Sequence, residues 1–499
     1  MTVTSDPTSR AQGTKTGART GTEQVARAGT EQVARTGTEQ GPPPEYRCPG
    51  ALTPQSIWQR EMAEVPEVLH EHWTDLGTRD IPYARYTSRE FHQAEVDKIW
   101  RKTWQFACRI EDLAVVGDSV VYDIASLSFL LVRVSEDEIK GYFNSCLHRG
   151  TQLREVDGRL PEIRCPFHGW TWHLDGGFKE MPSRWDFPQV DTAKLCLPEV
   201  RVGVFAGFVF INPDRESIDL EDYLAPMSAH FDRWWSWERK AKIAHTAKVV
   251  DANWKIVLNA GQESYHFRAT HPQSLLTLHE ANGQIDYWTH VARLATSVGM
   301  LPPPDWAEDV TEDDIVAAFS EVIGETSDPD VDDVELEPGQ SARDYIAPRA
   351  REQMAARLGT TVEQLAEEEA VDYIQYVAFP NFQIELNGLV LRYRPWNDDP
   401  DKALLELMIF APVPDGEPMP PPAPVQWLEP GQSYTTIPQF GPFGTVMDQD
   451  VSNMARVQRG MKAAEKSGIT LARYQESMIR WHHHVLDGYL GGANPAPGT

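Results

Sequence analysis

Two short segments of the sequence each combine a cysteine with a histidine. The first is a Cys-x-His segment at Cys146 and His148, and the second, sixteen residues later, is a Cys-x-x-His segment at Cys165 and His168. Two cysteines and two histidines in matched segments provide the four ligands that a metal site requires. A structural zinc ion accepts this set of ligands, and so does an iron–sulfur cluster.

The distribution of these ligands favours iron and sulfur. A typical zinc finger has both cysteines in one knuckle and both histidines in a helix, whereas here each segment supplies one of each. In a Rieske [2Fe–2S] centre two cysteines hold one iron and two histidines hold the other, so two symmetric loops can enclose the cluster. Neutral imidazole ligands raise its potential above that of an all-cysteine cluster. We therefore predict a cluster that accepts electrons from a ferredoxin or a flavin.

A second group of polar residues lies near the middle of the chain. Asn259, Glu263 and His266 follow one another at i, i+4 and i+7, so a helix would place them on one face. His271 comes five residues after His266, and Pro272 disfavours helical backbone at His271. We expect the helix to end there and the chain to turn, which would bring the two histidines together.

Two histidines and one carboxylate with open positions form the facial triad of non-haem Fe(II) oxygenases. The segment 446–461 offers Asp448 and Asp450 as the carboxylate. On a helix Asp450 shares a face with Met454, Val457 and Met461. Asp450 would then point to an apolar interior, where an unpaired carboxylate is costly unless it binds a cation. We choose Asp450; the alternative is that Asp450 caps the N-terminus of the helix.

Taken together, these motifs resemble those of one protein family. The Cys/His pattern is followed by Gly169-Trp170, an Asn-Trp-Lys motif begins at Asn253, and the late Asp precedes Gln458-Arg459-Gly460. This set is similar to the large (alpha) subunits of aromatic-ring-hydroxylating Rieske non-haem iron oxygenases. The resemblance covers roughly residues 80–490.

The resemblance implies two metal centres and a link between them. It implies a [2Fe–2S] Rieske cluster and a mononuclear Fe(II), whose ligands are Cys146, His148, Cys165 and His168 for the cluster and His266, His271 and Asp450 for the iron. It also implies that Glu263 links the iron to a Rieske cluster, usually that of the neighbouring subunit in a ring-shaped trimer. We count Asn259 and Glu263 as catalytic-site residues.

The activity that the resemblance implies is that of a terminal oxygenase. O₂ is the co-substrate, and a small organic molecule, aromatic or polycyclic, is hydroxylated or cis-dihydroxylated. Two departures bear on the substrate. Many ring dioxygenases have Asp where this chain has Glu263, which resembles the carnitine-type oxygenases of non-aromatic quaternary ammonium compounds. Naphthalene-dioxygenase-like proteins have a bulky aromatic residue where this chain has Ala260.

Two alternatives to a ring-hydroxylating oxygenase remain open. One is a monooxygenase of a non-aromatic, carnitine-like substrate. The other is a non-catalytic Rieske electron carrier, which would leave His266, His271 and Asp450 without a role. A carrier would hold only the two irons of its cluster, whereas an oxygenase would hold a third.

The chain has no module of its own for taking electrons from a nicotinamide. It contains neither a G-x-G-x-x-G motif between a strand and a helix nor a plant-type C-x₄-C-x₂-C ferredoxin motif. We therefore expect NAD(P)H to act only indirectly, through a separate reductase with or without a ferredoxin. By the same resemblance we expect a homotrimer or an α3β3 assembly.

Composition excludes some other classes of protein. The net charge of −28 disfavours nucleic acid as a partner, because phosphate binding needs clustered Lys and Arg. No apolar run reaches transmembrane length, so we expect no membrane partner. Five cysteines in 499 residues are not a disulfide framework. We therefore expect a cytoplasmic protein.

The expected fold is α+β, with a small β-rich Rieske domain inserted in a larger catalytic domain, whose antiparallel sheet is flanked by helices. The expected Rieske domain is 101–213, and the expected catalytic domain comprises 46–100 and 214–490. Alternating and apolar runs predict strands at 118–124, 128–134, 139–144, 201–211, 377–386, 389–394 and 403–411. Helical spacing appears at 447–463 and 472–489.

Four further features need an interpretation. Residues 1–45, which are rich in Gly, Thr, Gln and Pro, are expected to be a disordered tail. Residues 305–337 hold fourteen acidic and no basic residues and are expected to be a solvated insertion. The run His482–His484 cannot converge on one ion, because consecutive helical residues point about 100° apart; we expect these histidines to be mostly solvated. Gly261 lies in the middle of the predicted ligand helix, which implies either close backbone packing or room for a substrate larger than one ring.

Overall fold

The computed structural model describes residues 41–231, 237–278, 281, 283–303, 309–323, 336–358, 361–365, 371–414 and 416–491. Most of the expected tail, residues 1–40, lies outside the described residues. The expectation is wrong for its end, where Pro44–Tyr46 form a turn of 3₁₀-helix. Prolines 42–44 hold this stretch in place ahead of α2 (Pro54–Glu61), whose first turn is capped by Thr53.

The β-rich part of the fold is built from residues 105–212. Its antiparallel seven-stranded sheet has the order β2-β11-β10-β5-β4-β3-β6. The strands are β2 (Gln105–Arg109), β3 (Asp118–Ile124), β4 (Leu127–Arg133), β5 (Ile139–Phe143), β6 (Gly158–Arg159), β10 (Glu199–Phe205) and β11 (Phe208–Asn212). A three-stranded sheet of β7 (Ile163–Arg164), β8 (Thr171–Trp172) and β9 (Phe178–Glu180) lies beside it. The strands predicted between residues 118 and 144 and at 201–211 are confirmed.

The second large sheet contains eight strands in the order β13-β14-β15-β16-β17-β18-β12-β19. They are β12 (Lys240–Val250), β13 (Gly283–Tyr287), β14 (Val291–Thr296), β15 (Tyr373–Ala378), β16 (Phe382–Glu385), β17 (Leu389–Trp396), β18 (Asp399–Pro412) and β19 (Gln426–Leu428). Neighbours are antiparallel except β12 and β19. The single strand predicted at 377–386 is wrong: a turn at residues 379–381 divides it, because Pro380 has no N–H for a ladder.

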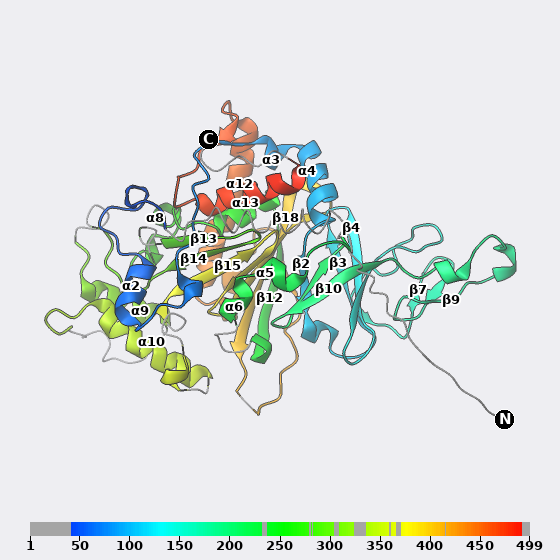
Figure 1. Ribbon diagram of the computed structural model, residues 1–499, viewed down its shortest axis with the longest axis horizontal. Helices are drawn as coiled ribbons and strands as arrows, with labels where there is room; N and C mark the ends of the chain where they lie inside the picture. Colours follow the sequence, from blue (N-terminus) through cyan, green and yellow to red (C-terminus); the bar gives the residue numbers. More distant parts are fainter. Residues whose placement is uncertain are drawn as a thin grey trace, which may run out of the picture. The chain divides into compact units, whose positions relative to one another are not determined.

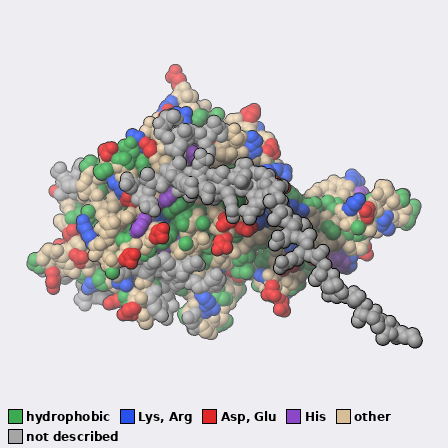
Figure 2. Space-filling view, in the orientation of Figure 1, with side chains coloured by type: hydrophobic (Ala, Val, Ile, Leu, Met, Phe, Trp, Pro, Cys, Tyr) green, Lys and Arg blue, Asp and Glu red, His purple; other side chains and the backbone are tan. Residues whose placement is uncertain are grey.

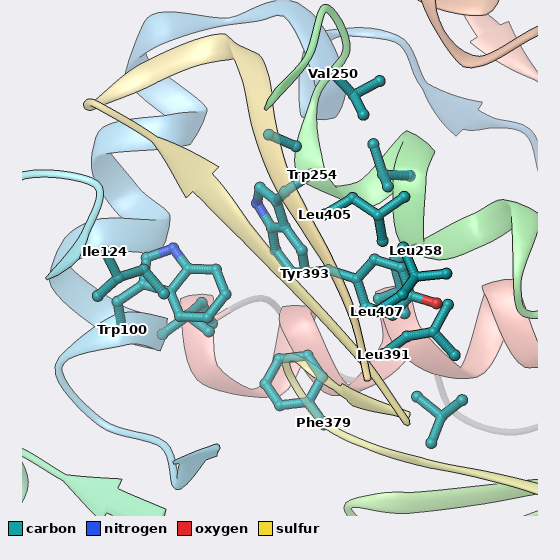
Figure 3. Close-up of a cluster of buried hydrophobic side chains, with 14 of the residues drawn as sticks. Trp100, Ile124, Val250, Trp254, Leu258, Phe379, Leu391, Tyr393, Leu405 and Leu407 are labelled. Atoms are coloured by element: carbon teal, nitrogen blue, oxygen red, sulfur yellow. The ribbon is translucent and has the colours of Figure 1, made fainter. Parts of the chain in front are cut away.

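Helices cover both faces of this sheet (Figure 1). On one face lie α7 (Trp254–Ala260), α12 (Phe443–Ala463) and α13 (Ser477–Leu490), so helices at 447–463 and 472–489 are confirmed with shifted ends. Figure 3 shows Leu391, Tyr393 and Leu405 of the sheet beside Trp254 and Leu258 of α7. On the other face α2, α5 (Leu220–Leu224) and α6 (Met227–Phe231) pack over the alternate side chains. None of the described helices is long and apolar enough to cross a membrane.

The acidic segment contains a helix with a buried side. Residues 309–323 and 336–337 of it are described, and α9 (Glu312–Ile323) packs against α10 (Ala342–Leu358). Ile315 and Val316 of α9 are buried there with Ile346. The expectation of a solvated segment is therefore wrong for α9. Its acids are concentrated in its first turn, where they interact favourably with the helix dipole.

The three consecutive histidines lie on α13 and correct a second expectation. His482 and His483 are buried, and only His484 is partly exposed. His483 Nε2 is hydrogen-bonded to the Tyr86 hydroxyl at 2.7 Å, and His482 packs against Trp254. The reason is tertiary packing: α13 is enclosed by the N-terminal segment and α7, so almost every side of its middle turns is covered.

On the molecular surface, acidic and basic side chains intermingle over the face drawn in Figure 2.

Candidate metal centres

The two Cys/His loops share one backbone design. In each loop the cysteine N–H donates to the carbonyl five residues ahead, and a glycine four residues ahead donates its N–H to the cysteine carbonyl. The bonds are Cys146 to Thr151 at 2.8 Å and Gly150 to Cys146 at 2.9 Å, then Cys165 to Trp170 at 2.8 Å and Gly169 to Cys165 at 3.1 Å. The two glycines have φ of +79° and +74°, a conformation that glycine adopts without strain. Equal loops of this kind present their side chains from two sides of one space.

The four predicted cluster ligands are brought together by these loops. The two cysteines are 3% and 2% exposed, and the rings of His148 and His168 have centroids 4.7 Å apart. His148 stacks on Trp170, which fixes its ring plane. Its Nδ1 is buried without a hydrogen-bond partner among the described residues, which is costly unless another group binds it. The donor set and this nitrogen fit a metal cluster.

The spacing of the donors distinguishes a cluster from a single ion. Within the described part of the chain, no three of these four residues have donor atoms within 4.8 Å of one another. A tetrahedral zinc with bonds of 2.0–2.3 Å would draw all four donors to within about 4 Å. A wider set of donors suits two irons. Burial, with Cys165 beside it, raises the pKa of the Cys146 thiol, so binding of metal must displace protons.

The helix predicted to carry Asn259, Glu263 and His266 is interrupted, which corrects the expected geometry. α7 ends at Ala260 with Gly261 as its C-cap, and a second short helix, α8 (Phe267–Thr270), begins after His266. Gly261 is therefore not in a helix interior. A Cβ on it would lie 2.6 Å from Gln383 Oε1, so of the two explanations for this glycine, close packing holds.

His266, His271 and Asp450 nevertheless meet. Their donor atoms lie within 4.8 Å of one another, and no other such group occurs among the described residues. Asp450 Oδ1 is 2.8 Å from His271 Nε2 and 3.5 Å from His266 Nε2. The opposite ring nitrogens have their own partners, since His266 Nδ1 is 2.7 Å from Glu263 Oε1 and His271 Nδ1 is 2.8 Å from Gln449 Oε1. Such partners orient imidazoles whose Nε2 atoms bind a metal.

The two candidate carboxylates have different surroundings. Asp450 lies inside α12, which begins at Phe443, so it is not the N-cap. Asp448 accepts hydrogen bonds from the Tyr434 N–H, at 3.0 Å, and from the Ser433 hydroxyl. The expected face of α12 is only partly right, because Met454 is buried but Val457 is exposed.

The charges around His266 favour a cation at this centre. Burial alone would lower its pKa, but the hydrogen bond and charge of Glu263, together with the charge of Asp450, raise it above the ordinary value. Asn259 lies apart from this group: its Nδ2 donates to the Tyr86 hydroxyl at 2.9 Å, and it does not line the cavity beside the three donors. Tyr86 was not found from the sequence.

A cavity of about 80 Å³ opens beside the three donors, between α7, α12 and the eight-stranded sheet. Most of its lining is apolar, including Leu294, Leu405 and Met454. The polar part of its floor could not be found from the sequence motifs and consists of Tyr373, Gln375, Gln383, Glu385 and Tyr393. Gln383 and Glu385 alternate with apolar residues in β16, and this period of two could have shown that they share a face.

Comparison with known families agrees with both centres. The model of the Rieske [2Fe–2S] domain matches residues 103–191, and the model of the ring hydroxylating alpha subunit (catalytic domain) matches residues 227–492. The carnitine monooxygenase oxygenase subunit of Escherichia coli (strain K12) is 30% identical over 223 residues, 44% of this chain and 57% of that protein. The anthranilate 1,2-dioxygenase large subunit of Acinetobacter baylyi is 26% identical over 202 residues, 39% of this chain and 43% of that protein. The chain thus spans about half the length of the curated relatives it matches.

Solved structures agree on the fold. A quaternary ammonium Rieske monooxygenase in complex with L-carnitine has a TM-score of 0.56 at 18% identity, over 86% of this chain and 99% of that one. A variant of naphthalene 1,2-dioxygenase bound to phenanthrene has a TM-score of 0.59 at 16% identity, over 85% of this chain and 95% of that one. The catalytic-domain model covers more than half of the 499 residues. This chain therefore belongs to the family of ring-hydroxylating alpha subunits, which carry a Rieske [2Fe–2S] cluster and a mononuclear iron.

Proposed function

We propose that this chain is the oxygen-activating, terminal component of a Rieske oxygenase system. The observation that carries the proposal is the convergence of two histidine Nε2 atoms and one carboxylate oxygen on the wall of a mostly apolar cavity. Bound there by His266, His271 and Asp450, iron would supply O₂ activation, with electrons from the cluster held by Cys146, His148, Cys165 and His168. The product is a hydroxylated or cis-dihydroxylated organic molecule.

The residues around the triad hold it ready for metal. Glu263 accepts the Nδ1–H of His266, and Gln449 accepts that of His271. The lone pair of each Nε2 is therefore available to a metal ion. Glu263 also accepts the His266 backbone N–H at 3.0 Å, so its carboxylate is fixed at both oxygens. Glu263 thereby positions His266, and we assign it the link to a Rieske cluster.

Exposed side chains beside the two metal centres indicate where other subunits bind. Phe167, beside His168, is 57% exposed, and Tyr265, between Glu263 and His266, is 55% exposed. Large apolar side chains at the edge of each redox centre suit contacts between subunits, which supports a homotrimer or α3β3 assembly. Electrons come from a separate reductase, with or without a ferredoxin. Cys108, Cys146, Cys165 and Cys196 form no disulfide, which supports a cytoplasmic site of action.

The cavity favours a compact substrate. Its volume of about 80 Å³ is smaller than the cavity of about 150 Å³ that binds benzene in an engineered protein. A molecule of more than one ring would need the lining to move. We therefore favour hydroxylation of a compact molecule over that of a polycyclic one.

Metal analysis tests the proposal. The anaerobically purified chain should contain three irons and two acid-labile sulfides, and a surrogate reductase with NADH should drive O₂ consumption. Addition of nitric oxide should produce the EPR signal of an Fe(II)–nitrosyl, which probes the open positions of the third iron. Two irons and no nitrosyl signal would identify an electron carrier instead. Zinc in place of iron would identify a structural site.

A further inference from the structure

The cavity beside the triad has a second polar end. The register of β15 and β16 pairs Gln375 with Glu385, and both side chains line the cavity floor. Tyr393 of β17 donates its hydroxyl hydrogen to Gln383 Oε1 at 2.6 Å, and Tyr373 donates to Gln375 Oε1 at 2.8 Å. The Tyr393 hydroxyl and the Gln383 amide oxygen therefore satisfy one another, whereas the Tyr373 hydroxyl is a partner of Glu385 as well as of Gln375. Glu385 is the one ionisable side chain of this group with carboxylate oxygens to offer to a ligand.

Glu385 has no cationic partner among the residues that the structure describes. It is 5% exposed, and its hydrogen-bond partners are neutral: Asn387 Nδ2 at 3.3 Å, with Tyr373 and Gln383. The described lining of the cavity includes no Lys and no Arg. Burial raises the pKa of Glu385 to about 7. A buried carboxylate without a cation is costly, so a ligand that carries a positive charge would remove that cost.

We propose that Glu385 recognises the charge of the substrate, and that the substrate is a compact organic ammonium compound without a carboxylate group. The inference rests on the proposed function, which makes this cavity the place of the substrate. Tyr373 and Tyr393 supply aromatic surface next to Glu385, and ammonium groups bind to such surface. Both tyrosines also interact electrostatically with Asp450 of the triad. Both tyrosines line the same cavity as Glu385 and Asp450, so a cation held there shares the cavity with the metal site.

The absence of Lys and Arg from the described lining bears on the kind of substrate named for the relatives of this chain. Carnitine, glycine betaine and anthranilate, named for three of them, each carry a carboxylate. A substrate carboxylate beside Glu385 would meet another carboxylate and no Lys or Arg of the described lining, because the one cation that the proposed function places in this cavity is the iron held by the triad. Like charges repel strongly where buried protein groups surround them. The cavity should therefore reject anions as well as select cations.

A series of three molecules with nearly the same shape tests this selection. The probes are tetramethylammonium, tert-butanol and trimethylacetate, which carry a positive charge, none and a negative charge. Binding to the metal-loaded chain is measured by calorimetry without O₂ and at about pH 8, where Glu385 is mostly ionised. Tetramethylammonium should bind at least about tenfold more tightly than tert-butanol, and trimethylacetate should bind more weakly than either. Equal affinity for the first two, or no measurable binding of the cation, overturns the proposal.

A matched pair of variants locates the effect. Glu385→Gln keeps the shape and removes the charge, so the preference for the cation should disappear, whereas Glu429→Gln, at an exposed position, should keep it. A preference that survives Glu385→Gln overturns the proposal. If Glu385→Gln does not fold, the probe series on the parent chain still decides. Iron content and cluster absorbance are recorded on every sample, so loss of the metals, which contradicts the proposed function, is distinguished from loss of charge selection.

Discussion

The Nε2 atom of His271 lies 2.8 Å from Oδ1 of Asp450, although 179 positions separate the two residues in the chain. His271 is fully buried in the turn that follows α8, and Asp450 reaches it from the second turn of α12. The Nε2 atom of His266 lies 3.5 Å from the same oxygen. Two elements from distant parts of the sequence thus supply the three donors of one centre.

Asp450 and Asp448 should differ in what their loss removes. Asp450→Ala should lose the mononuclear iron and keep the absorbance of the cluster, because two histidines alone hold Fe(II) poorly. Asp448→Ala should keep all the iron but unfold more easily, by roughly 1–3 kcal/mol, since Tyr434 N–H and the Ser433 hydroxyl lose their acceptor. Iron analysis and thermal unfolding of both variants measure this. Iron loss in the Asp448 variant alone would show that the wrong carboxylate has been assigned.

Replacing one imidazole of the cluster by a thiolate should change its colour and potential. His148→Cys adds a negative charge to the cluster, so its reduction potential should fall and its visible and EPR spectra should change. His173→Cys, at an exposed position just after the second loop, is the control and should leave the spectra as they are. Spectra of the His148 variant that match the parent would contradict the ligand assignment.

The role of Glu263 can be separated from its mere charge. Glu263→Gln retains an acceptor for His266 but removes the negative charge beside it, so both metal centres should persist while most turnover with a surrogate reductase is lost. Glu476→Gln removes a half-buried carboxylate that interacts with Glu263 only through space, and turnover should change little. If the Glu263 variant turns over as fast as the parent chain, Glu263 is only a surface acid and does not link the two metal centres.

The features that sequence reasoning could predict are those encoded within a few residues. The strands at 118–124 and 128–134 follow from their side-chain pattern, and the Cys/His spacing is a local motif. The features that the sequence could not predict depend on packing between residues that are far apart in the chain. α7 ends at Ala260, and its C-cap Gly261 lies against Gln383 and Tyr393, more than a hundred residues away. The cavity floor is defined by the register of the sheet. The pattern of a single helix contains neither contact.

His482 makes the fold sensitive to acid. Burial lowers its pKa to about 3, with Lys255 and Arg85 adding to the effect, whereas an unfolded histidine titrates near 6.5. Below about pH 6.5 the unfolded chain therefore binds a proton at this histidine, whereas the folded chain does not. The contribution of this residue to the free energy of unfolding is intact above that pH and is lost as the pH falls toward 3. At pH 5.5 this proton binding lowers the free energy of unfolding by about 1.4 kcal/mol.

His482→Leu should remove this dependence, because neither ring nitrogen has a hydrogen-bond partner among the described residues and leucine fits an apolar site. The fall in Tm between about pH 7.5 and pH 5.5 should become smaller by about 1–2 °C. His70→Leu, at an exposed position, serves as the control and should follow the parent chain. An unchanged fall in the His482 variant would mean that other groups cause the acid sensitivity.

Two Gly→Ala changes should have effects of opposite sign. A Cβ at Gly261 would lie 2.6 Å from Gln383 Oε1 and 3.0 Å from the Tyr393 hydroxyl, two atoms already joined by a short hydrogen bond under the cavity. Gly261→Ala must push this buried pair aside, and overpacking of that kind costs roughly 1–3 kcal/mol.

Gly460 lies inside α12, where an added Cβ meets no atom within 4 Å. Gly460→Ala should therefore stabilise the chain by about 0.4–1 kcal/mol, because alanine restricts the unfolded backbone and favours the helix. Denaturant unfolding of the two variants measures both signs. If Gly261→Ala is as stable as the parent, the floor of the cavity can move by the width of a methyl group, and the argument for a compact substrate loses its basis.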